Sequence, residues 1–129
     1  MRNTESEDDR PPVAIGHVSF RTNKVGESTD FLIKLGLRSI FASENFAVLE
    51  LRGGTHLIVK PADESIAPGS KAPFDLMVDD VEVARKHYGD AGMEPSAIEE
   101  GNIHNWFTIV DPSGCEITVT SSHTGRRAV

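Results

Sequence analysis

Two histidines and two acids in this 129-residue chain occupy positions from which they can do chemistry together. His17, His56, Asp75 and Glu116 each lie in a short stretch where apolar and polar residues alternate. Because side chains alternate between the two faces of a strand, we expect all four to point away from the apolar face. Two histidines with one carboxylate suit iron, manganese or zinc, so His17, His56 and Glu116 are a candidate metal site. Without a metal, His17 or Asp75 can act as a general base.

Other side chains are placed to line a ligand pocket on the same face. The indole of Trp106 offers an aromatic wall for a planar or cationic ligand, although it can equally anchor a dimer interface. Glu50 joins this face if its apolar neighbours on the strand point toward helices, and His104 lies in a loop at the mouth. The candidate ligand-binding residues are therefore Trp106, Glu116, Thr118, Glu50 and His104.

A structural role is the alternative for the two acids. The alternation along the strands is expected to place Arg21 and Lys60 on the same face as Asp75 and Glu116. An ion pair with either cation would neutralise the acid and leave it unavailable to a ligand.

The elements that position these residues repeat. In the first half of the chain we expect one helix, at 25–35, for which Asn23 is a plausible cap. Four strands are expected around it, at 13–22, 37–42, 46–51 and 55–60. After the turns and prolines of residues 61–71, strands are expected at 73–78, 93–98, 105–110 and 115–121, with a helix from Val81 capped by Asp79 or Asp80. The last two strands flank an Asp111-Pro112-Ser113-Gly114 turn, which fixes their register. This order predicts an α+β fold of two βαβββ modules.

The resulting boundaries cover the whole chain. We expect a disordered tail at 1–12, a first module at 13–60, a linker at 61–71, a second module at 72–121 and a tail at 122–129. The formal charge of −7, without a basic stripe, argues against nucleic acid or an anionic membrane as partner. The chain has one cysteine and no apolar run of transmembrane or signal-peptide length, so we expect a cytoplasmic protein.

The two modules, the Ile-Gly-His-Val-Ser-Phe first strand and the Asp-Pro-Ser-Gly hairpin together resemble the vicinal oxygen chelate superfamily, which includes glyoxalases, extradiol dioxygenases and bleomycin resistance proteins. The resemblance implies a cup-shaped curved mixed sheet with helices outside, a small-molecule ligand or a divalent metal (Fe, Mn, Zn or Ni) inside, and a homodimer. It places metal ligands on the first and last strand of each module. Those positions hold His17, Pro73, Thr118, and either His56 or Ile58, so at best two of four carry a strong ligand.

Three functions follow from the resemblance and the residues. The leading hypothesis is a metal-free binding protein of the bleomycin-resistance type, with an acidic, aromatic-lined pocket. The competing hypothesis is a metal-dependent glyoxalase or dioxygenase-type enzyme, a lyase or oxidoreductase that uses His17 and His56. The third is a metal-free lyase or isomerase.

Overall fold

The computed structural model describes residues 8–125 and 127–129, and within them the chain repeats one order of elements. The first half contains β1 (His17–Thr22), α1 (Val25–Leu35), β2 (Arg38–Ala42), β3 (Ala47–Glu50), the 3₁₀ turn η1 (Arg52–Gly54) and β4 (His56–Pro61). The second half contains β5 (Lys71–Val78), α2 (Val81–Asp90), β6 (Glu99–Glu100), β7 (Asn105–Val110) and β8 (Glu116–Ser121).

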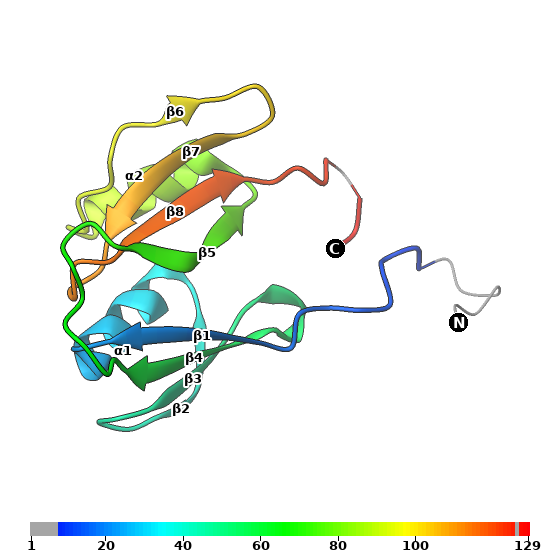
Figure 1. The fold of residues 1–129 in the computed structure, drawn as a ribbon. Coiled ribbons are helices and arrows are strands. Elements are labelled where there is room, and N and C mark those ends of the chain that lie inside the picture. Colours follow the sequence, from blue (N-terminus) through cyan, green and yellow to red (C-terminus); the bar gives the residue numbers. More distant parts are fainter. Residues whose placement is uncertain (1–7, 126) are drawn as a thin grey trace.

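Each half forms a four-stranded mixed sheet of the same topology. The strand orders are β1-β4-β3-β2 and β5-β8-β7-β6. In each sheet the first and last strands of the half are parallel neighbours, and the other pairs are antiparallel. The halves meet along β1 and β5 (Figure 1), where Phe20 and Phe74 pack with ring centroids 5.8 Å apart. The predicted α+β fold of two βαβββ modules is confirmed, and the two sheets do not close into a barrel.

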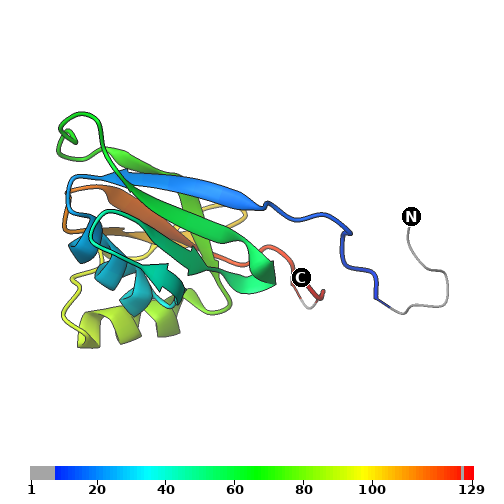
Figure 2. The same ribbon diagram turned by 90° about the horizontal axis from the view of Figure 1, so that it is seen from below.

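Both helices cover the same side of the strands (Figure 2), and this side holds the core. The buried strand residues alternate with partly exposed ones, as in Leu57 and Val59 of β4 or Ile117 and Val119 of β8. We call the opposite side, away from the helices, the open face. As the alternation predicts, the open face carries His17, Glu50, His56, Asp75, Trp106, Glu116 and Thr118.

A buried hydrogen-bond chain ties the two halves together. The Ser28 hydroxyl on α1 donates to Oδ2 of Asp111 at 2.5 Å, and Thr22 Oγ1 lies 2.8 Å from the same hydroxyl. Since the one proton of Ser28 goes to Asp111, Thr22 is the donor to Ser28. Asp111 Oδ1 also accepts from Ser113 and from the backbone N–H of Cys115. The Asp-Pro-Ser-Gly turn is therefore both a hairpin and a contact with the first half.

Three local expectations from the sequence are corrected. β1 begins at His17 rather than at residue 13, and the residue before α1 is Lys24, with no side-chain cap from Asn23. Asp80 does cap α2, accepting from the N–H of Val83 at 3.0 Å. Residues 93–98 form no strand, because Pro95 has no N–H to give to a ladder, and the short strand β6 follows at Glu99–Glu100.

The described residues at the two ends of the chain, 8–16, 122–125 and 127–129, form no helix or strand. Residues 1–7, most of the segment expected to be a disordered tail, lie outside the described residues, and residues 8–16 contain no helix or strand. In the described part of the chain, neither helix is long and apolar enough to cross a membrane.

Candidate functional site

A row of polar side chains crosses the open face of the first sheet. The register aligns His17 of β1 with His56 of β4, His56 with Glu50 of β3, and Glu50 with Arg38 of β2. The two imidazole rings have centroids 6.1 Å apart. Nε2 of His56 lies 3.2 Å from Oε2 of Glu50, while the guanidinium of Arg38 bonds the other carboxylate oxygen. Sequence periodicity predicted the shared face, and the strand register supplies these partners.

Glu50 is the electrostatic centre of this row. Its hydrogen bonds to Arg38 and His56 hold the pKa of the Glu50 carboxyl below its ordinary range, which keeps it ionised. An ionised carboxylate only accepts hydrogen bonds, so Nε2 of His56 carries the proton. In the neutral imidazole, Nδ1 is then the nitrogen with the free lone pair. The pair Glu50–His56 is thus arranged like an oriented general base.

The open face of the second sheet is hollowed around Trp106. A hollow of about 480 Å³ lies between the strands and the loop after β6. Register places Asp75 beside Thr118, and Trp106 beside Thr120. We call this space the Trp106 hollow; it is lined by Asp75, Gly101, Asn102, Ile103, His104, Trp106, Thr118 and Thr120.

Asp75 has no hydrogen bond or ion pair within the described part of the chain. It lines the Trp106 hollow and also two neighbouring hollows between the halves. The predicted alternative, in which Arg21 or Lys60 neutralises one of the acids, is wrong for both. Glu116 pairs with Lys71, whose Nζ lies 3.3 Å from Oε1, because the two residues are register partners on β5 and β8.

Gly101 fixes the position of the indole and was not singled out from the sequence. Its N–H donates to the carbonyl of His104 at 2.8 Å, closing a tight turn. A Cβ on Gly101 would lie 2.7 Å from Cζ3 of Trp106 and 2.9 Å from the His104 oxygen. The turn therefore needs glycine to let the indole pack against the backbone. The only signal in the sequence is a glycine inside a short polar loop, which is common in turns of any kind.

His104 is held more firmly than a free loop residue. Its Nδ1 lies 3.2 Å from the carbonyl oxygen of Ser121 and donates to it, and its ring packs at 5.2 Å from that of His123. The structure therefore places His104 at the rim of the Trp106 hollow, and within the described residues its Nε2 has no hydrogen-bond partner.

The residues present do not fit the divalent metal that the resemblance implies. Within residues 8–125 and 127–129, no group of three or more His, Cys, Asp or Glu side chains is close enough to hold an ion. His17 and His56 are neighbours, but Glu116 lies in the other sheet and is paired with Lys71. The second module offers no strong ligand at the positions where the resemblance expects one, because Pro73 cannot coordinate a metal and Thr118 is a poor ligand.

Comparison with known proteins gives the fold. No protein-family model and no curated protein sequence matches this chain. Lactoylglutathione lyase from Agrobacterium tumefaciens is similar in structure, with a TM-score of 0.72 at 15% identity over 91% of this chain and 99% of that one. The oxidase ChaP-H2 gives a TM-score of 0.67 at 16% identity, covering 89% and 98%. A bleomycin resistance determinant encoded on transposon Tn5 also gives 0.67 at 16%, covering 85% and 98%. The chain has the vicinal oxygen chelate fold shared by glyoxalases, bleomycin resistance proteins and dioxygenases.

Proposed function

We propose that this protein binds a small organic cation with an aromatic or planar group in the Trp106 hollow. One observation carries the proposal: a carboxylate without a partner in the described structure, Asp75, lines the same hollow as the single tryptophan of the chain. A carboxylate attracts a cation, and an indole face binds planar and cationic groups. The hydroxyls of Thr118 and Thr120 can orient the ligand by hydrogen bonds.

Binding without metal chemistry agrees best with the side chains present. Of the four positions at which the resemblance expects metal ligands, those of the second module hold Pro73 and Thr118, so at best His17 and His56 are strong donors. Among the structural neighbours, the Tn5 determinant is described as conferring bleomycin resistance. A protein named for resistance to a drug thus shares this fold, which supports a ligand-binding role here.

Trp106 fluorescence tests the proposal directly, because the chain has no other tryptophan. Benzamidine, a planar cation at neutral pH, is titrated against its neutral analogue benzamide, and bleomycin is titrated in parallel. An exposed ion pair contributes up to about 1 kcal/mol and a cation–π contact about 0.5 to 1, so benzamidine should bind about tenfold more tightly. Equal affinity for the two analogues, or no change of fluorescence with any of the three, contradicts the proposal.

A second candidate, metal-free proton transfer, is favoured by the Glu50–His56 pair. Nδ1 of His56 is the basic atom, and the carboxylate of Glu50 fixes the orientation of the ring. The Kemp elimination of 5-nitrobenzisoxazole is a suitable probe: the base takes the carbon-bound proton, the N–O bond breaks, and a nitrile with a phenolate forms. A rate above background that is lost in His56→Ala and reduced in Glu50→Gln supports this activity. A rate that both variants retain removes it.

We also propose that two copies of the chain associate. Ile40 and Phe41 of β2 are each 53% exposed, and Phe46 packs on Phe41 with ring centroids 6.2 Å apart. β2 is the edge strand of its sheet, with a bulge between Ser39 and Phe41. An exposed edge with aromatic side chains is a surface that a second copy can cover.

A further inference from the structure

We propose that the open face carries a second site, separate from the Trp106 hollow, that binds an oxyanion such as phosphate or carboxylate. The site lies where β1 of the first half meets β5 of the second. Arg21, Lys71 and the hydroxyl of Ser19 are its donors, and Lys60 adds positive charge beside it. It does not depend on the function proposed above.

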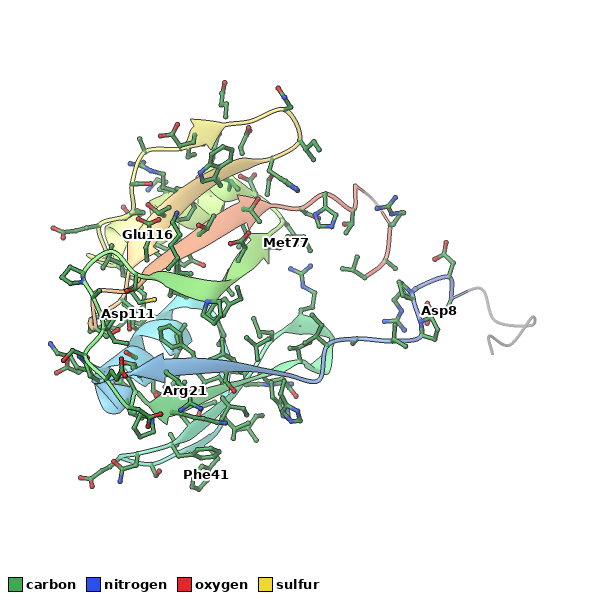
Figure 3. The ribbon with its side chains drawn as sticks, in the orientation of Figure 1. Asp8, Arg21, Phe41, Met77, Asp111 and Glu116 are labelled. Carbon is green, nitrogen blue, oxygen red and sulfur yellow. The ribbon has the colours of Figure 1, made fainter. Side chains whose placement is uncertain are left out.

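A cavity is present at this place. It has a volume of about 230 Å³, and Ser19, Arg21, Ser70 and Lys71 supply its polar lining. Its floor reaches the buried ring of Phe20 and the buried thiol of Cys115. In Figure 3, Arg21 lies on β1 and Glu116 on β8, on either side of the junction between the halves. The volume is sufficient for a phosphate or carboxylate group together with a few apolar atoms.

The cations around this cavity lack enough anionic partners. In the described part of the chain, Arg21 makes one long hydrogen bond, from Nη1 to the carbonyl oxygen of Pro61 at 3.5 Å, and no ion pair. Lys60 is the register partner of Arg21 on the neighbouring strand and likewise has no ion pair there. Adjacent strands are about 4.8 Å apart, so two like charges stand side by side. An anion between or beside them removes this repulsion.

The donor set matches the geometry of an oxyanion. The guanidinium fork of Arg21 can give two parallel N–H bonds to one phosphate or carboxylate group. Lys71 contributes a point charge from the opposite strand, and the Ser19 hydroxyl, which has no partner in the described structure, can donate a third bond. The hydroxyl of Ser70 is already used, since it donates to the carbonyl of Ala67 at 2.6 Å.

Glu116 acts as an internal competitor at this site. Its carboxylate holds Lys71 at 3.3 Å and thereby occupies one of the three cations near the cavity. Removing this carboxylate charge frees Lys71 and removes a repulsive charge. Glu116→Gln should therefore improve anion binding, whereas Arg21→Ala should weaken it.

Amide chemical shifts from ¹H–¹⁵N NMR spectra measure this binding. Sodium phosphate is titrated at neutral pH against sodium chloride of equal ionic strength, so that general screening is matched. We expect saturable shifts at Ser19, Arg21 and Lys71 with phosphate alone. Arg21→Ala loses a charge-assisted bidentate contact and should bind phosphate about tenfold or more weakly. The affinity of Arg21→Lys should lie between those of Arg21→Ala and the wild type. Lys34→Ala, which removes an exposed cation on α1, is the matched control and should bind as the wild type does.

Phenyl phosphate and benzoate then identify the source of the anion. If phenyl phosphate or benzoate binds more tightly than inorganic phosphate, the site is assigned to the acidic group of an organic molecule. If they bind equally, it is assigned to free phosphate. Equal shifts with phosphate and chloride, wild-type affinity in Arg21→Ala, or no gain in Glu116→Gln would each overturn the proposal. Asp75→Asn should leave phosphate binding unchanged, so failure of this site and failure of the cation site are distinguishable.

Discussion

Among single residues, two acids of the open face, Glu50 and Asp75, have opposite surroundings. Glu50 is bonded on both sides, by Arg38 and by His56, and its side chain is 18% exposed. Asp75 has no such partner in the described structure and faces the Trp106 hollow. A bonded carboxylate orients its neighbours, whereas a carboxylate without a partner is available to a ligand. Carboxylates on the same face can therefore differ in role: Glu50 is held by its neighbours, whereas we propose that Asp75 binds a ligand.

The surroundings of Glu50 predict a pH dependence of stability. Its pKa in the folded protein is lower than the unfolded value of about 4.3, so the folded state binds fewer protons. The stabilisation is present above the unfolded pKa and is lost as the pH falls through the folded pKa. The difference in unfolding free energy between wild type and Glu50→Gln should thus shrink as the pH falls from 6 toward 3. Urea unfolding at several pH values measures it, and a constant difference would contradict the assignment.

At the scale of elements, the loop that follows β6 sets the shape of the ligand site. Gly101 lets the backbone approach the indole of Trp106, and its turn also positions His104. We expect Gly101→Ala to displace the indole or the loop, changing the emission spectrum of Trp106 and weakening benzamidine binding.

Gly26→Ala is the control for this change. Gly26 lies on α1, where an added Cβ would meet nothing within 4 Å. Alanine there should raise the unfolding free energy by about 0.5 to 1 kcal/mol without affecting the ligand. Wild-type fluorescence and affinity in Gly101→Ala would show that the loop does not fix the indole.

The buried hydrogen-bond chain from Thr22 through Ser28 to Asp111 should stabilise the contact between the two halves. Ser28→Ala removes the hydroxyl that joins the halves and leaves the buried Oδ2 of Asp111 with one donor fewer. The expected loss is about 1 to 3 kcal/mol of unfolding free energy, measured by urea denaturation. Ser65→Ala, in an exposed loop, should change stability by less than about 0.5 kcal/mol. A loss no larger than that of the control would mean that the chain does not couple the halves.

The sequence predicted these elements where a local pattern determines them. Alternation placed His17, Asp75 and Thr118 on the open face, and the Asp80 cap and the Gly36 end of α1 follow from local backbone chemistry. The strand predicted at residues 93–98 was wrong, because Pro95 has no backbone N–H to donate to a neighbouring strand, whatever the spacing of the apolar residues around it.

The partners within the site could not be predicted in the same way. The bonds that Arg38 and His56 make to Glu50 depend on the register between strands, and the pairing of Glu116 with Lys71 depends on two strands that are 45 residues apart at that contact. The Gly101 contact with Trp106 depends on how the loop folds back on β7. None of these leaves a periodic signal in the sequence.

In the molecule as a whole, neither helix of the described residues covers the open face. All of β2 is exposed, including Phe41 (Figure 3), and the two sheets stay open on the side away from the helices. These surfaces explain why we propose that two copies associate.

Light scattering during size-exclusion chromatography tests the association. We expect a mass near two copies of the 14.0 kDa chain. Phe41→Ser should shift the protein toward one copy, because it removes an exposed aromatic anchor. Val83→Ser, which changes an exposed apolar residue on α2, should not. A wild-type mass of one copy, or no effect of Phe41→Ser, would contradict the proposed association.

A matched pair of variants isolates the carboxylate of Asp75, which we propose binds a planar cation together with Trp106. The affinity for benzamidine, followed by Trp106 fluorescence, is measured for Asp75→Asn and for Asp30→Asn, which removes an exposed carboxylate on α1. Both variants change the net charge equally, so only a local effect separates them. We predict about tenfold weaker binding for Asp75→Asn and wild-type binding for Asp30→Asn. Equal affinities in the two variants would contradict the claim.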